Sequence, residues 1–136
     1  MNSRLEATGL KVGYGAKTII SSLDVAIPDK KVTTIIGPNG CGKSTLLRAM
    51  SHLLPLQAGS VHLDGRDVHA MRRRDLARLL GMLPQSPIAP EGLLVSDLVA
   101  RGRHPHQAWF RQWSSDDEEH VYEALRLTHV EDLADR

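Results

Sequence analysis

The sequence predicts an α/β fold, and three observations lead to this prediction. Short apolar and β-branched runs separated by turn residues fill residues 4–36, which is typical of strands. A glycine-rich loop at 37–44 then separates an apolar run from leucines at helical spacing. A further strand pattern and two helix patterns follow this loop. Strands and helices that alternate around one loop favour an α/β architecture.

The N-terminal elements follow from local patterns. Residues 4–15, RLEATGLKVGYG, predict a strand with a turn, and residues 21–37, SSLDVAIPDKKVTTIIG, predict two strands separated by the turn PDKK. The second of these strands, Val32 to Ile36, is predicted to be buried. In KSTLLRAMSHLL, residues 43–54, apolar side chains recur every three or four residues, so we expect a helix that Pro55 stops.

The C-terminal elements are predicted in the same way. GSVHLDG, residues 59–65, predicts a strand that ends at an Asp-Gly turn, and RRRDLARLLG, residues 72–81, predicts a short helix. GMLPQSP is expected to be the end of another apolar strand, which leaves the sheet at Pro84. SSDDEEHVYEALRLT, residues 114–128, predicts a helix with a capping box, with Ser115 as N-cap and Glu118 three residues on.

Composition limits the classes of function. A chain of 136 residues, 41% hydrophobic and 24% charged, predicts one soluble globular domain. The net charge of +1 gives no electrostatic reason to expect a nucleic-acid partner. The single cysteine, Cys41, excludes a disulfide framework and suits a reducing compartment. The N-terminal segment lacks the pattern of a secretory signal and no run is long enough to span a bilayer, so we expect a partner protein to supply any membrane contact.

The loop matches GxxxxGK[ST] from Gly37 to Ser44, between a predicted strand and a predicted helix. Its glycines allow backbone angles closed to other residues, so that successive N–H groups converge on one anion. Lys43 adds a charge for β- and γ-phosphates, Ser44 offers a hydroxyl to Mg²⁺, and a helix beginning at Thr45 adds N–H donors. A plain glycine turn would not explain the lysine and hydroxyls. We therefore predict a phosphate cradle made by Gly37, Pro38, Asn39, Gly40, Cys41, Gly42, Lys43, Ser44 and Thr45.

Cys41 also invites a nucleophilic or redox interpretation, because a helix N-terminus and a nearby lysine both lower the pKa of a thiol. The sequence places no His and acid partner for it. A small residue that fills the loop is therefore the favoured interpretation.

The chain resembles the ATP-binding subunits of ABC transporters. The resemblance rests on GPNGCGKSTLLRAM, with GYG upstream and GSVHLDGRDV and GMLPQSP downstream. Residues 89–136, which include ARGRHPHQAWFRQWS, narrow it to the iron-siderophore and cobalamin importer branch, especially the ferric-enterobactin-like ATPases. It implies the N-terminal part of a P-loop NTPase of the ABC type, with a β-rich subdomain, phosphate-loop strand and helix at about 1–86 and the start of a helical subdomain at about 87–136.

The resemblance assigns roles to two further residues. Tyr14 falls where the family stacks an aromatic ring on adenine, although an ordinary core or turn tyrosine is the alternative. Gln85 matches the glutamine that ligates Mg²⁺ and senses the γ-phosphate at a hinge to the helical subdomain, and Pro84, Pro87 and Pro90 favour a hinge independently. At Lys30, in the PDKK turn, relatives usually have glycine, which puts the geometry of this turn in doubt.

The segment from Arg101 to Trp113 gathers arginines and aromatic residues. Such residues could stack on nucleic-acid bases, but they are equally enriched at protein interfaces. The resemblance places the segment near the groove that receives a cytoplasmic helix of the membrane subunit, so we expect it to dock on a membrane-spanning permease; core packing of at least one Trp is the alternative. His104 and His106 lack ligand-like spacing to a carboxylate or cysteine.

Three features of the family are absent from these 136 residues: an LSGGQ-type signature, an apolar strand ending in Asp-Glu, and a switch histidine. What remains is the binding part of a phosphoryl-transfer site, so we expect no complete catalytic set and no self-sufficient ATP hydrolysis. The absent strand would belong to the same sheet as residues 32–36, so we expect exposed apolar surface there. A fragment of a longer gene product is the simplest account.

The sequence thus predicts the ATP-binding component of an ABC importer for iron-siderophore complexes, with ATP and Mg²⁺ as its ligands. The expected partners are permease subunits and a second copy of the chain, at the cytoplasmic face of the inner membrane. One alternative is a non-catalytic short form that binds nucleotide and docks on the membrane subunit. Another is an unrelated P-loop kinase or GTPase, but the NKxD motif of GTPases is absent and nothing outside the loop resembles a kinase.

Overall fold

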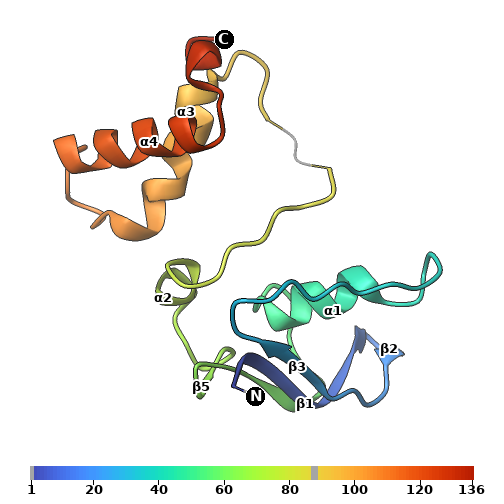
Figure 1. The fold of residues 1–136 in the computed structure, drawn as a ribbon. Coiled ribbons are helices and arrows are strands. Elements are labelled where there is room, and N and C mark those ends of the chain that lie inside the picture. Colours follow the sequence, from blue (N-terminus) through green and yellow to red (C-terminus); the bar gives the residue numbers. More distant parts are fainter. Residues whose placement is uncertain (1, 87–88) are drawn as a thin grey trace. The chain divides into compact units, whose positions relative to one another are not determined.

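The computed structural model describes residues 2–86 and 89–136. The chain divides into two compact units, Met1–Met82 and Leu83–Arg136, and Figure 1 shows the strands in the first and a group of helices in the second. Among the described residues, no helix is both long and apolar enough to cross a lipid bilayer.

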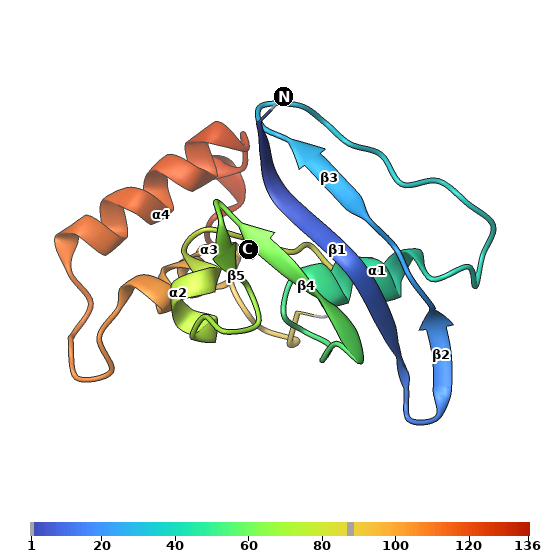
Figure 2. The same cartoon turned by 90° about the horizontal axis from the view of Figure 1, so that it is seen from below.

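The first unit is built on a five-stranded sheet around the long strand β1, Ser3–Tyr14. β3 (Val25–Pro28) and β2 (Lys17–Ile20) pair with successive parts of β1, and β4 (Ala58–Leu63) pairs with its other edge. β5 (Arg66–Asp67) extends the sheet beyond β4. All these pairs are antiparallel, and Figure 2 shows β1 between β3 and β4.

Two predicted turns are confirmed by the backbone. The β4–β5 hairpin turns at Asp64 and Gly65, with φ of 50° and 79°, which is the pattern of a type I′ turn. The β1–β2 hairpin turns at Gly15, whose φ of 57° suits glycine. The strands predicted within residues 4–15, 21–28 and 59–65 are therefore present.

Helix α1, Lys43–Met50, covers one face of this sheet. It buries Leu46, Ala49 and Met50 against the alternate inward residues of β1 and β4, and Leu76 of α2, Arg73–Ala77, completes the group. At roughly 2 kcal/mol for each large buried side chain, this small core is the main stabilising contribution to the unit. The core residues are Ala7, Leu10, Val12, Leu46, Ala49, Met50, Val61, Leu63, Val68 and Leu76.

Helix α1 ends earlier than predicted. Met50 is its last residue, and the prediction that Pro55 stops it is wrong. His52 adopts a φ of 61°, and the N–H of Leu53 donates to the carbonyl of Arg48 at 2.8 Å. This bond across the helix end is that of a Schellman motif, so a left-handed residue terminates the helix before the proline is reached.

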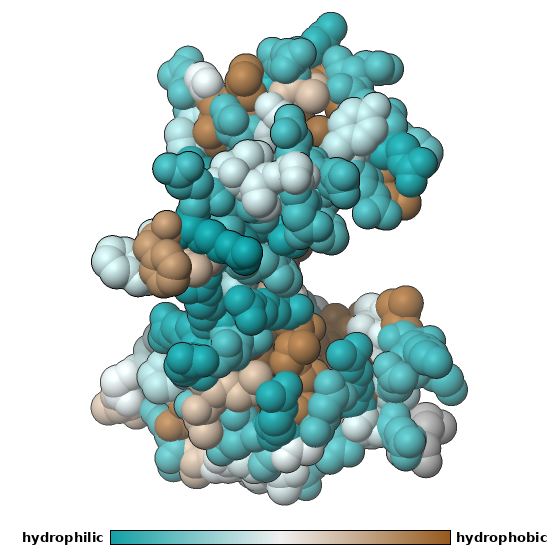
Figure 3. All heavy atoms as spheres, turned by 90° about the vertical axis from the view of Figure 1, so that its left-hand side faces the viewer, coloured by the Kyte–Doolittle hydropathy of each residue, from teal (hydrophilic) through white to brown (hydrophobic). Residues whose placement is uncertain are grey.

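Two predicted strands are not formed. Residues 32–36 carry no strand structure, and Val32 and Ile36 are 96% and 87% exposed, so the predicted buried strand is wrong. Residues 81–84 are likewise irregular, with Leu83 exposed. A strand needs a neighbour for its N–H and C=O groups, and no described strand pairs with either segment. The exposed apolar surface expected here is present, and brown apolar side chains lie at the surface on the face drawn in Figure 3.

The second unit consists of α3 (Val95–Ala100), a 3₁₀ helix (Arg101–His106), α4 (Ser115–Leu127) and a short 3₁₀ turn (Glu131–Leu133). Val121 and Leu125 are the buried apolar residues of α4. The first turn of α3 is closed by the chain end, because the N–H groups of Val95 and Ser96 donate to the carbonyls of Arg136 and Ala134.

The predicted capping box of α4 exists one residue earlier. Ser114, not Ser115, is the N-cap, and Asp117, not Glu118, is its N3 partner. The Ser114 hydroxyl accepts from the N–H of Asp117 at 3.2 Å, and the Asp117 carboxylate accepts from the N–H of Ser114 at 3.1 Å. Asp117 is buried and bonded to Arg103, and this contact with another element selects the register.

Candidate functional site

The phosphate loop, residues 37–42, is an exposed turn that leads directly into α1. Gly40 and Gly42 have φ of 81° and 102°, where side chains are disfavoured. A Cβ on Gly37 would lie 2.8 Å from the Sγ of Cys41, so a side chain there would require this exposed thiol to shift. The helix begins at Lys43, two residues before the predicted start at Thr45.

Lys43 folds back over the loop. Its ammonium group donates to the carbonyl of Gly37 at 2.5 Å and to that of Pro38 at 2.9 Å, and it lies 3.9 Å from the Sγ of Cys41. These contacts hold a full positive charge at the mouth of the loop. Cys41 is an exposed free thiol within this arrangement, and its loop-filling role stays a prediction.

The N-terminus of α1 presents open hydrogen-bond donors beside this charge. Gly42 is its N-cap and provides no side-chain cap, and the first turn contains no acidic residue. The first N–H groups of a helix have no partner within the helix, so those of Lys43 and Ser44 are available to an anion. The Ser44 side chain is exposed, whereas Thr45 is buried. Open donors, positive φ and a retained ammonium group together fit a polyphosphate.

Mg²⁺ would have to come with such a polyphosphate. Among the described residues, no group of three or more His, Cys, Asp or Glu side chains is arranged to hold a metal ion. Magnesium keeps several waters and takes one or two protein ligands plus phosphate oxygens, and the exposed Ser44 hydroxyl fits one such position.

Tyr14 lies at the end of β1, beside α1. Its side chain is 46% exposed, which leaves part of the ring open. Hydrogen bonds from the side chains of Thr45 and Arg48 lower the pKa of Tyr14, and the Nη1 of Arg48 donates to the phenol oxygen at 3.4 Å. The structure therefore brings Tyr14 to the helix that begins at the phosphate loop.

Gln85 and the phosphate loop do not belong to the same compact unit. Gln85 is exposed and belongs to the second unit, whereas the loop belongs to the first. Its role in metal binding and coupling, and the hinge around it, stay predictions. Of the three prolines that favour this hinge, Pro87 lies outside the described residues.

The segment from Arg101 to Trp113 places its aromatic rings at the surface. Trp109 and Phe110 are 91% and 78% exposed, and their rings meet edge to face with centroids 6.2 Å apart. Trp113 is also exposed, so the alternative of a core tryptophan is wrong. The segment stays a candidate interaction surface.

Arg103 has a different role from its neighbours, one that the sequence did not reveal. Its Nε donates to the Asp117 carboxylate at 2.9 Å, and the pair is nearly buried. The Arg103 guanidinium and the N–H of Ser114 lower the pKa of Asp117, and the Ser114 hydroxyl and Gln107 add to the effect. Arg103 therefore fixes the start of α4.

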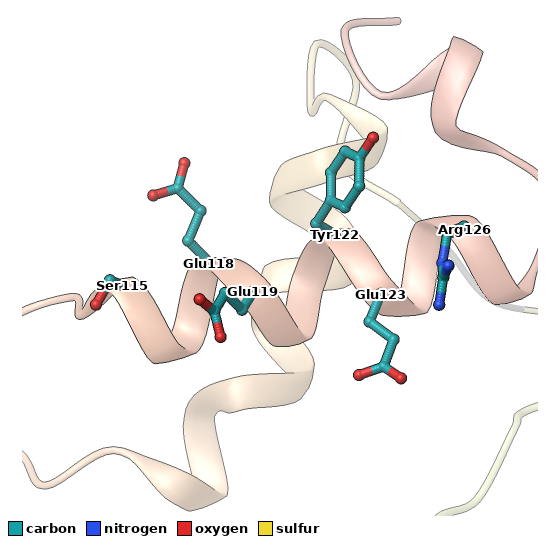
Figure 4. A pocket seen from close by; sticks show the side chains of 6 residues that line it. All are labelled: Ser115, Glu118, Glu119, Tyr122, Glu123 and Arg126. Atoms are coloured by element: carbon teal, nitrogen blue, oxygen red, sulfur yellow. The ribbon is translucent and has the colours of Figure 1, made fainter.

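A shallow hollow lies along α4 and is drawn in Figure 4; three of its six lining residues are glutamates. All of the residues that line this hollow come from one helix, and the sticks point in several directions away from it. Nothing in this arrangement indicates a ligand, so we assign it no site. The lining residues are Ser115, Glu118, Glu119, Tyr122, Glu123 and Arg126.

Comparison with known proteins relates this chain to one protein family. A model of the ABC transporter family matches residues 20–136. The achromobactin transport ATP-binding protein CbrD of Dickeya dadantii is 49% identical over 93% of this chain and 47% of that protein. The ferric enterobactin transport ATP-binding protein FepC of Escherichia coli is 46% identical over 98% of this chain and 49% of that protein. For the iron(3+)-hydroxamate import ATP-binding protein FhuC of Bacillus subtilis the values are 44%, 100% and 50%. The chain thus spans about half the length of the curated relatives it matches.

Solved structures agree on the fold. The ADP conformation of MJ1267, an ATP-binding cassette of an ABC transporter, matches with a TM-score of 0.78 at 22% identity, over all of this chain and 57% of that one. A nucleotide-free ATP-binding cassette matches with a TM-score of 0.79 at 20% identity, over 99% of this chain and 57% of that one. At these identities the likeness concerns the fold alone, and it confirms the predicted class of α/β fold.

Proposed function

Because this chain belongs to the ABC transporter family, we propose that it forms the ATP-binding part of an importer for iron-siderophore complexes. The names of the relatives, which include transport proteins for achromobactin, enterobactin and iron hydroxamate, support this substrate class. The observation that carries ATP binding is the ammonium group of Lys43, held over an exposed loop whose N–H donors continue into α1.

In this proposal the residues of the site contact different parts of ATP and Mg²⁺. The N–H groups of residues 40 and 42–44 surround the β-phosphate, since the N–H of Cys41 donates to the carbonyl of Pro38, while Lys43 turns from the loop carbonyls to the phosphate oxygens. Ser44 contributes its hydroxyl to Mg²⁺, and Tyr14 receives the adenine ring. Gln85 is proposed as a further ligand of Mg²⁺, the role that the resemblance implies for it. Thr45 supports the cradle from its buried position in the first turn of α1.

We further propose that these 136 residues bind ATP without hydrolysing it. Phosphoryl transfer requires a positioned water and metal-holding carboxylates in addition to the phosphate cradle. The sequence has neither the LSGGQ-type signature nor a strand ending in Asp-Glu. Steady ATP hydrolysis by the purified chain, abolished by Lys43→Ala, would contradict this proposal. A non-catalytic form that docks on the membrane subunit is the second candidate, and it would use the same exposed aromatic segment.

The proposed partners are permease subunits and a second copy of the chain, at the cytoplasmic face of the membrane. Docking on the permease would use the segment from Arg101 to Trp113, where Trp109 and Phe110 offer exposed apolar area. Aromatic residues and arginine are enriched at the energetic centres of interfaces. Arg103 is excluded from docking because Asp117 already holds it.

The test is ATP affinity with and without the Lys43 ammonium group, measured by equilibrium dialysis of the whole chain. Two unit charges about 4 Å apart attract by roughly 4 kcal/mol at an effective dielectric constant of about 20. Giving up two carbonyl hydrogen bonds costs about 1 kcal/mol each, so a net gain of about 2 kcal/mol remains. Lys43→Ala should therefore weaken ATP binding about thirtyfold.

Lys31→Ala is the matched control, because Lys31 is exposed and lies outside the loop. It should leave ATP affinity unchanged. A second readout uses the exposed Cys41 thiol: bound ATP should slow its alkylation in the wild-type chain and not in the Lys43→Ala variant. Equal ATP affinities for wild type and Lys43→Ala would refute the assignment of the cradle.

A further inference from the structure

We propose that Arg48 is a positioning residue for the nucleobase, because it holds the Tyr14 ring in place at the end of β1. The Nη1 of Arg48 donates a hydrogen bond to the Tyr14 phenol oxygen, with 3.4 Å between the two atoms. The inference rests on the proposed function, since it concerns how the same site receives the base of ATP.

The backbone that carries Tyr14 is already constrained. A Cβ on Gly13 would lie 2.1 Å from the carbonyl oxygen of Lys17, so the two strands of the hairpin approach more closely than a side chain allows. The side-chain amide of Gln57 donates to the carbonyl of Gly15 at 3.3 Å, just beyond Tyr14. The Cα position of Tyr14 is therefore set by the β1–β2 hairpin.

The ring of Tyr14 is fixed by α1 instead. Thr45 and Arg48 are three residues apart on this helix and so lie on the same face. Both form side-chain hydrogen bonds with the Tyr14 hydroxyl, which is why they lower its pKa. With its hydroxyl held at the helix, the ring cannot swing freely, and its exposed part stays available for stacking.

This arrangement places both ends of the nucleotide site on one helix. Lys43 and Ser44 begin α1, and Arg48 follows Lys43 by five residues, or about 7.5 Å along the helix axis. Among the described residues no carboxylate forms an ion pair with Arg48. The distance between phosphate cradle and base platform is thus set by the helix, provided that Arg48 keeps Tyr14 attached to it.

The test compares ATP with inorganic tripolyphosphate, which has the phosphates but no base. Tyr14→Phe keeps the ring and removes the hydroxyl, and Arg48→Met removes the guanidinium. Arg48→Met should weaken ATP binding by about threefold to tenfold, as expected for one hydrogen bond, and Tyr14→Phe, which also loses the bond to Thr45, should weaken it at least as much. Both should leave tripolyphosphate binding unchanged. Arg66→Met is the control, because Arg66 is exposed on β5 and carries the same charge; it should change neither affinity.

The double variant shows whether the two residues act through one contact. If they do, the double variant Tyr14→Phe with Arg48→Met should bind ATP no more weakly than whichever single variant has the lower ATP affinity. Multiplicative losses would overturn the proposal, as would equal losses for ATP and tripolyphosphate. Failure of the wild-type chain to bind either ligand would instead overturn the proposed function itself.

A direct readout of the contact is the titration of the Tyr14 phenol, followed by absorbance at the tyrosinate band. The chain has two tyrosines, so the measurement uses a Tyr122→Phe background. This background is suitable because the Tyr122 side chain is exposed on α4. Arg48→Met should raise the pKa of Tyr14, and Arg48→Lys should restore part of the shift because it keeps a donor. An unchanged phenol pKa in Arg48→Met would show that the guanidinium does not hold the ring.

Discussion

Replacing Ser114 and Ser115 one at a time distinguishes the two alternative N-caps of α4. Ser114 accepts a hydrogen bond from the N–H of Asp117 at 3.2 Å and donates to its carboxylate at 2.9 Å. Loss of an N-cap serine costs about 1 kcal/mol, within a range of roughly 0.5–2 kcal/mol. Ser115 is the first residue of the helix, where alanine is favoured by up to about 0.5 kcal/mol. Ser114→Ala should therefore destabilise α4, and Ser115→Ala should not.

Hydrogen exchange of individual amides is the suitable assay. The two compact units need not unfold together, so a single urea transition would not isolate α4. A loss of 1 kcal/mol corresponds to about a fivefold faster exchange, which we expect at the Asp117 amide and at the buried Val121 one turn later. Faster exchange in Ser115→Ala than in Ser114→Ala would refute the assignment of the cap.

Two further predictions concern charge and backbone strain. The pKa of Asp117 is lower in the folded chain than its ordinary value of 3.8, so its stabilising effect is complete above about pH 4 and is lost as the pH falls below that value. The melting temperature of Asp117→Asn should therefore depend less on acid pH than that of the wild-type chain. An equal dependence in the two chains would contradict the Arg103 contact. Lys30 has a φ of 56°, where left-handed strain of about 1–2 kcal/mol exceeds the entropic cost of glycine of about 0.5–1 kcal/mol. Lys30→Gly should therefore raise the melting temperature, whereas Lys31→Gly, at a residue without positive φ, should lower it, and equal losses would rule out strain at Lys30.

Local patterns predicted what local interactions determine. The Asp64–Gly65 turn, the phosphate loop and the amphipathic helices all depend on residues within a few positions of one another. The N-cap of α4 shows where such patterns become ambiguous, because Ser114 and Ser115 are each followed three residues later by an acid. Arg103 resolves the ambiguity from another element by binding Asp117, and no pattern within α4 reports that contact.

Residues 32–36 show a second limit of local patterns. Their β-branched composition is typical of a buried strand, but burial requires neighbouring strands, and no described strand pairs with them. Arg48 shows a third. In the sequence it reads as an exposed helical position, and only the placement of β1 beside α1 brings Tyr14 to it. Long-range contacts decide all three cases.

The two sides of the phosphate loop are held very differently. On the α1 side, the buried Leu46 and Ala49 anchor the loop to the core, whereas on the other side Ile36 is exposed and Ile35 packs against the core only partly buried. The hydrogen bonds from Lys43 to the carbonyls of Gly37 and Pro38 join these sides. A bound phosphate that draws Lys43 away must itself order the start of the loop, at a cost of about 1 kcal/mol or more for each residue fixed. We therefore expect nucleotide binding by this chain to be weaker than it would be with residues 32–36 paired in a sheet, and we expect strand pairing and ATP binding to reinforce each other.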